Sequence, residues 1–207
     1  MQRPFIDAHV HLNTNTQAKL QLAAQYDAYF VSINTDIPFF IDLQAQREMI
    51  NTLNQNTPRA FFITSFDTQY WNTPRWLPHA MEQIKAGIAA GAKGVKIWKN
   101  IGMDENLKDT QGNFVLLDDA RFDPIFQYLS DAGIVLLNHQ GEPRNCWLPL
   151  EEMTVASDRE YFAAHPEYHM FKNKHYPSYE AHMAARDRVL ERFPKLHYVG
   201  LHLFSME

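Results

Sequence analysis

The sequence predicts an α/β fold built on a parallel sheet, because strand-like and helix-like segments alternate along the chain. Apolar runs with the length of buried strands begin near residues 5, 29, 60, 94, 134 and 197. Most of the segments between them carry apolar residues at helical spacing, which is typical of βαβ units with helices on the outer face of the sheet. A chain of 207 residues is long enough for one domain with a sizeable core.

Each element is expected from a local pattern. The expected strands are 5–12, 29–33, 60–66, 95–98, 134–138 and 197–203. The expected helices are 17–26, 42–54, 76–90, 119–132 and 179–193. Gly91 follows the third helix and Gly133 follows the fourth, where a helix terminus favours glycine, and Pro194 ends the last one.

Residues 143–178 interrupt this alternation. They are rich in proline, glutamate, histidine and aromatic residues, and they show little periodicity. A loop of this length in a compact domain is usually functional or disordered, so we expect an insertion over the carboxyl ends of the strands. The sequence ends at Glu207, soon after the sixth expected strand. A doubly wound sheet could end there, whereas a closed eight-stranded barrel typically needs about 250 residues.

Composition and charge make several functions improbable. Hydrophobic residues make up 45% and the net charge is −5, so nothing in the charge favours binding to nucleic acid or an anionic membrane. No window approaches the roughly 18 apolar residues of a membrane span, and no signal peptide is visible. We therefore expect a cytoplasmic protein whose partner is a small-molecule substrate. Cys146 is the only cysteine, which excludes an intramolecular disulfide.

The strongest functional signal is the first strand, in which Asp7, His9 and His11 occupy alternate positions. Alternate side chains share one face of a strand, so the two imidazoles can point at one ion. Neutral imidazole suits zinc and neighbouring divalent metals. The structural alternative is a pair of buried histidines bonded to the backbone.

Three further residues have positions that suit a site. His139 ends the fifth expected strand and His202 ends the sixth, and in a parallel barrel such ends meet at the rim where active sites lie. Lys96 points inward from the fourth strand, which is costly unless the lysine is paired. Lys96 could bind a substrate carboxylate, be carboxylated and bind metal, or pair with an interior acid such as Asp7.

Taken in order, these residues resemble the amidohydrolase superfamily, above all its amidohydrolase-related branch of lactonases, decarboxylases and predicted metal-dependent hydrolases. The stretches that carry the resemblance are 6–12, 93–102, 137–143 and 198–203. The resemblance spans the chain and implies a (β/α) TIM-type barrel. Because the sequence ends after the sixth strand, we expect a barrel truncated there, with residues 1–207 as one partial domain.

The same resemblance implies a metal-dependent hydrolase that attacks a small amide, ester or lactone with a metal-activated water. The metal ligands would be His9, His11 and His139, and His202 would be a further ligand or the catalytic acid–base group. The cofactor would be one or two divalent ions, zinc first among them. Members of the family complete this site with an eighth-strand aspartate, to which no residue of this sequence corresponds.

Other side chains are expected around the metal. The candidates for binding substrate or bridging two metals are Lys96, Glu142 and Arg144. Asp7 would contact the metal ligands without binding the metal itself. Glu142 is equally a candidate for a salt bridge at the rim. Two alternatives to hydrolysis stay open. One is a non-oxidative decarboxylase with the same metal ligands. The other is an inactive metal-binding fragment, because an enzyme without the aspartate would lose general acid–base catalysis, which alone contributes about 10²–10⁴-fold to the rate. Association into homo-oligomers is also open.

Overall fold

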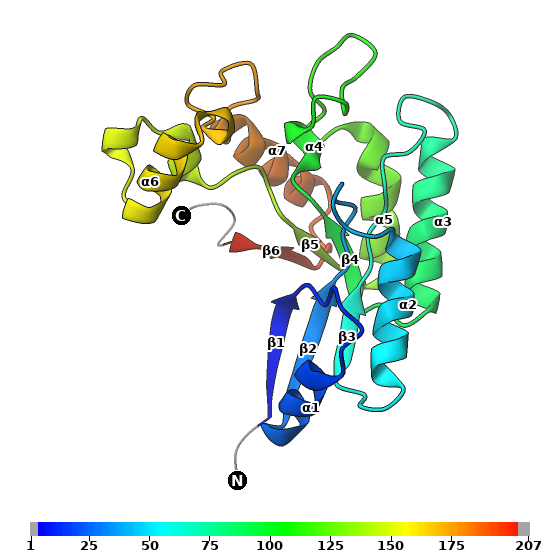
Figure 1. The fold of residues 1–207 in the computed structure, drawn as a ribbon. Coiled ribbons are helices and arrows are strands. Elements are labelled where there is room, and N and C mark those ends of the chain that lie inside the picture. The colour runs from blue at the N-terminus through cyan, green and yellow to red at the C-terminus, as the bar shows by residue number, and fades with distance from the viewer. Residues whose placement is uncertain (1–3, 203–207) are drawn as a thin grey trace. The chain divides into compact units, whose positions relative to one another are not determined.

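The structure, a computed structural model, describes residues 4–202 and contains the expected alternation of strands and helices (Figure 1). The strands are β1 (Phe5–Val10), β2 (Ala28–Ile33), β3 (Ala60–Ile63), β4 (Gly94–Ile97), β5 (Val135–Asn138) and β6 (Tyr198–Gly200). The α-helices are α1 (Ala18–Gln25), α2 (Leu43–Asn54), α3 (Trp76–Ala89), α4 (Asn100–Met103), α5 (Asp123–Ala132), α6 (Ala156–Ala164) and α7 (Tyr179–Arg192).

The segment 143–178 departs from the expectation of an irregular loop. It contains α6 and three short 3₁₀ turns, at Arg144–Trp147, Leu150–Glu152 and Pro166–Tyr168. None of the residues of α6 is buried, so this helix lacks the apolar stripe by which a helix is recognised in a sequence. Leu203, at the end of the expected sixth strand, lies outside the described residues.

The strands form two three-stranded sheets, with the orders β1-β2-β3 and β4-β5-β6. In the first sheet the pairs β1–β2 and β2–β3 are parallel, as the alternation with helices predicts. The chain also divides into two compact units. Of the described residues, 4–97 and 134–136 form the first unit, and 98–133 and 137–202 form the second. The expectation of one barrel domain stays a prediction.

The first unit has its core between the sheet β1-β2-β3 and its helices. Helix α1 packs on β2 and α2 packs on β3. The buried side chains of this core include Leu20, Ile50, Leu53 and Phe62. Helix α2 begins where the Asp42 carboxylate accepts a hydrogen bond from a first-turn backbone N–H, which is why its start is visible in the sequence.

The second unit is built mainly around α5 and α7. The expected apolar stripe of α5 is buried through Ile125, Phe126 and Leu129. Gly133 ends that helix in the left-handed conformation, with φ of 63°. Among the described residues, no helix is long and apolar enough to cross a bilayer.

Candidate metal ligands and an adjoining pocket

The end of β1 brings His9 and His11 side by side in the first unit. Their ring centroids are 5.7 Å apart and the rings meet edge to face. The pairing of β1 with β2 shifts register between Asp7 and Val10, so strict alternation of side chains does not hold at this point. The Asp7 carboxylate accepts a hydrogen bond from the backbone N–H of His9 at 3.2 Å, which ties it to the start of the pair.

His11 is held in a form that suits metal binding. Its Nδ1 lies 2.8 Å from the carbonyl oxygen of Ile33, and a carbonyl only accepts, so Nδ1 carries the proton and Nε2 has a lone pair. Burial lowers the pKa of His11, the charge of Lys96 lowers it further, and the hydrogen bond to Ile33 opposes them. The net lowering favours neutral imidazole. A histidine that binds metal through one nitrogen commonly donates the other N–H to a backbone carbonyl.

A second histidine pair lies in the second unit. His139 follows β5 and His202 follows β6, and their ring centroids are 4.4 Å apart. The backbone N–H of Leu201 donates to the carbonyl of Asn138 at 3.0 Å, so the strand ends bring the two histidines together. His202 has a left-handed backbone, with φ of 51°. The expectation that both histidines lie at strand ends is met.

The donor chemistry of each pair fits a divalent metal, because imidazole nitrogen is a favoured ligand of zinc. Within residues 4–202, no group of three histidine, cysteine or acidic side chains lies together. The two pairs belong to different units. The three-ligand set of His9, His11 and His139 therefore stays a prediction.

Lys96 is buried in β4 of the first unit, with 2% of its surface exposed. Burial lowers the pKa of its ammonium to about 7. The pairing with Asp7 that the sequence allowed is not formed, because Asp7 is exposed on β1 and contacts the backbone of His9 instead. In the part of the chain that the structure describes, no ion pair or hydrogen bond satisfies the Lys96 ammonium.

Glu142 and Arg144 follow β5 in the second unit. The Glu142 carboxylate forms an ion pair with the ammonium of Lys99, and a salt bridge was one of its two expected roles. Arg144 is exposed at the start of the 3₁₀ turn Arg144–Trp147. Its expected contact with substrate stays a prediction.

Among the buried titratable residues that sequence reasoning missed is His182 on α7. It is fully buried, and burial lowers its pKa to about 4. Its Nδ1 lies 3.4 Å from the amide nitrogen of Gln140, and its Nε2 has no hydrogen-bond partner among the described residues. His182 is separated from the buried Ala185 and Val189 by helical spacing, so the sequence marks it only as a core position.

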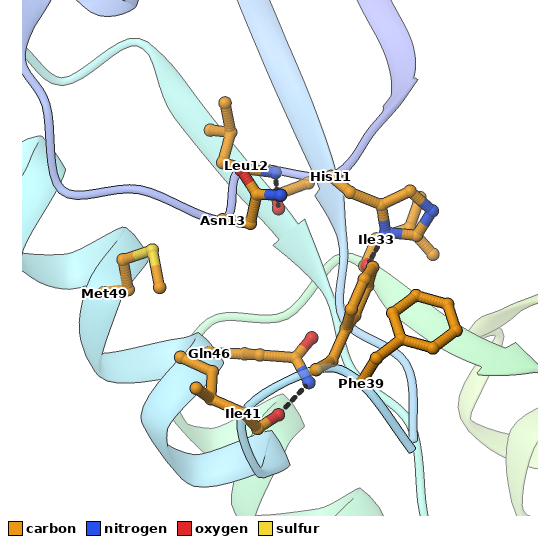
Figure 2. Close-up of a pocket in the computed structure, with 10 residues that line it drawn as sticks. His11, Leu12, Asn13, Ile33, Phe39, Ile41, Gln46 and Met49 are labelled. Carbon is orange, nitrogen blue, oxygen red and sulfur yellow. Dashed lines mark hydrogen bonds between the residues drawn. The ribbon is translucent and has the colours of Figure 1, made fainter. Parts of the chain in front are cut away.

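A pocket of about 400 Å³ adjoins His11 (Figure 2). Its lining comes from four segments of the first unit, which are the chain after β1, the end of β2, the loop between β2 and α2, and α2 itself. The size lies within the usual range for small-molecule sites, about 300–1,000 Å³. Phe39 and Phe40 line it, and the signal that could have found them is a pair of adjacent aromatic residues in the loop between the second expected strand and the second expected helix.

No family model matches the sequence, and no curated protein is similar to it. Several solved structures are similar in fold. An uncharacterised TIM-barrel protein from Bordetella bronchiseptica has a TM-score of 0.51 and 13% identity, over 95% of this chain and 66% of that one.

Two further structures are similar at lower scores. An amidohydrolase from Mycobacterium avium subsp. paratuberculosis K-10 has a TM-score of 0.47 and 16% identity, over 89% of this chain and 47% of that one. A 2,6-dihydroxybenzoate decarboxylase from Rhizobium has a TM-score of 0.48 and 13% identity, over 96% and 65%. This chain thus spans between 47% and 66% of the length of these three proteins. The likeness to the Bordetella protein shows that the chain has part of the α/β fold of a TIM-barrel protein.

Proposed function

We propose that this chain is part of a metal-dependent hydrolase of the amidohydrolase superfamily, which acts on a small amide, ester or lactone. The observation that carries the proposal is the pair His9 and His11, with the proton of His11 directed to the carbonyl of Ile33 and its Nε2 left as a metal ligand. The ordered motifs of the first, fourth, fifth and sixth strands support the same superfamily.

The residues have distinct roles in this proposal. His9, His11 and His139 bind one divalent ion, or the first of two, zinc first among the candidates. The chemistry that such an ion supplies is the activation of water and the polarisation of a carbonyl. His202, next to His139, exchanges a proton with the reacting oxygen or serves as a further ligand. Arg144 is exposed and free to bind a carboxylate on the substrate.

Lys96 favours a second candidate, a non-oxidative decarboxylase with the same metal ligands. Lys96 is buried and has no ion-pair partner among the described residues, so a substrate carboxylate that paired with its ammonium would offset the cost of burying the charge. Product analysis separates the two functions, since a hydrolase releases an acid and a decarboxylase releases carbon dioxide.

Metal content tests the proposal. We expect the purified chain, loaded with zinc and desalted, to hold about one ion per chain by mass spectrometry, because imidazole pairs of this kind bind zinc. The double variant His9→Ala/His11→Ala should lose that ion.

The matched control removes two histidines that are exposed in the second unit, as His165→Ala/His175→Ala, and should keep the ion. Circular dichroism on all three proteins verifies that the fold is retained. A wild type that binds no zinc, or a His9/His11 variant that binds as much as the control, would contradict the proposal.

A further inference from the structure

We propose that the pocket beside His11 binds a single aromatic ring carried by the substrate, so that the substrate class is a monocyclic aryl carbonyl compound. The inference rests on the proposed function and adds to it the group by which the substrate is selected. Three features of the pocket support this proposal: its apolar walls, the hydrogen bonds that its polar side chains already form, and its volume.

The walls are apolar and aromatic. The ring of Phe40 meets the ring of His11 edge to face at 5.2 Å, and the ring of Phe39 meets that of Phe40 in the same manner at 5.2 Å. The aliphatic and methionine side chains that add to the apolar lining are Leu12, Ile33, Ile41 and Met49 (Figure 2). Aromatic pairs prefer such edge-to-face geometry, so a ring bound in the pocket would extend the series that is already present.

Gln46 and Ser32, two of the polar side chains that line the pocket, are already engaged in hydrogen bonds. The amide of Gln46 donates to the carbonyls of Thr35 and Ile41, at 2.9 and 2.7 Å, and accepts from the backbone N–H of Thr35 at 3.0 Å. The hydroxyl of Ser32 accepts from the backbone N–H of Leu12 at 3.2 Å. A polar or charged guest would find few partners in these two side chains, and a buried polar group without a partner is costly.

The hydrogen bonds of Gln46 also fix the loop of the pocket before a guest arrives. Gln46, on helix α2, donates to the carbonyls of Thr35 and Ile41, which precede and follow Phe39 and Phe40 in the loop, so the loop is held at both ends. Figure 2 shows the hydrogen bond to Ile41. A preformed site costs less ordering of side chains on binding. The pocket therefore selects its guest by shape rather than by folding around it.

Size and exposure indicate one ring. A volume of about 400 Å³ lies at the lower end of the range for small-molecule pockets, which suits a monocyclic group better than a fused system. Phe39 is 79% exposed, an unfavourable state for a large apolar side chain that a bound ring would partly relieve. With the ring against Phe40, the reactive carbonyl extends from the pocket at His11.

Binding of 4-fluorobenzamide, followed by ¹⁹F NMR, tests this inference without any need for turnover. We expect it to bind at least about tenfold more tightly than acetamide, because acetamide lacks the ring. Met49→Trp fills the pocket and should raise the Kd about tenfold or more. Phe40→Leu keeps the wall apolar but removes the ring contact, and should raise the Kd about three- to tenfold. Met81→Trp, on α3 and outside the pocket, should leave the Kd unchanged.

A direct contact measurement does not depend on how the variants fold. In wild-type protein labelled at the methionine methyl groups, we expect nuclear Overhauser effects from the ring protons to the Met49 methyl and none to the Met81 methyl. The absence of the Met49 contact, or equal binding of the two amides, would overturn the inference.

The same samples keep this failure apart from failure of the proposed function. Zinc retained without ring binding would overturn the pocket and leave the hydrolase proposal standing. Ring binding in a protein that holds no zinc would support the pocket and contradict the metal site.

Discussion

At the residue scale, His182 shows what burial does to a titratable group. Its pKa is lowered from 6.5 to about 4, because a charged imidazole in the interior of the second unit would lose its hydration. At a pH between about 4 and 6.5, this histidine binds more protons in the unfolded chain than in the folded chain. The contribution of this group to stability is therefore complete above pH 6.5 and falls as the pH drops toward 4.

We expect the free energy of unfolding to fall by on the order of 3 kcal/mol over that range through His182 alone. Urea unfolding at several pH values between 7 and 4 measures this loss. The variant His182→Gln carries no titrating ring and should show a shallower dependence, whereas His165→Ala, at an exposed position, should behave as the wild type. If the free energy of unfolding depended equally on pH in the wild type and in His182→Gln, burial would not shift the pKa of His182.

At the scale of elements, α3 is positioned by a glycine that helix propensity alone would disfavour. Gly87 lies inside α3, where glycine costs about 1 kcal/mol relative to alanine. A Cβ atom at this position would overlap the side chain of Thr64, which follows β3. The missing side chain thus permits the close packing of the helix against the end of that strand.

We therefore expect Gly87→Ala to lower the free energy of unfolding by about 1–3 kcal/mol, as overpacking does, although alanine is the better helix former. Chemical denaturation measures the difference. Glu82→Ala, at an exposed position of the same helix, should change stability by less than about 0.5 kcal/mol. A stabilised Gly87→Ala protein would mean that propensity outweighs packing here.

At the scale of the whole molecule, the outer strand β1 bears on association. In the described sheet β1 pairs only with β2, and its residues Phe5 and Ile6 are 53% and 60% exposed. Unpaired backbone groups beside exposed apolar side chains favour pairing with another chain. The homo-oligomer left open by the sequence thus has a candidate surface.

Sedimentation velocity over a concentration series tests this surface. We expect the wild type to associate as its concentration rises, and Ile6→Lys to shift it toward the monomer, since a charged edge residue opposes strand pairing. Val155→Lys introduces the same charge at an exposed apolar position of the second unit and should leave association unchanged. A wild type that stays monomeric throughout, or an Ile6→Lys protein that associates equally, would contradict the expectation.

The sequence by itself determined the order of the elements and the place of the histidines. Every expected strand and helix is found within a few residues of its expected bounds, because periodicity, caps and stop residues act locally. Helix α6 was not predicted from the sequence, because it buries no residue and so carries no apolar stripe. His9 and His11 at the end of β1, and His139 after β5, follow from their position in a strand pattern alone.

Only the tertiary structure decided the chemical state of these residues. The proton of His11 is directed by Ile33, which lies 22 positions away, and the pocket wall comes from a loop whose Phe40 ring meets His11 only in the folded chain. The exposure of Asp7 removed the acid with which Lys96 could have paired. Partners and burial arise from segments that are distant in sequence, and the free energy of a charge or a hydrogen bond depends on those surroundings rather than on the residue type.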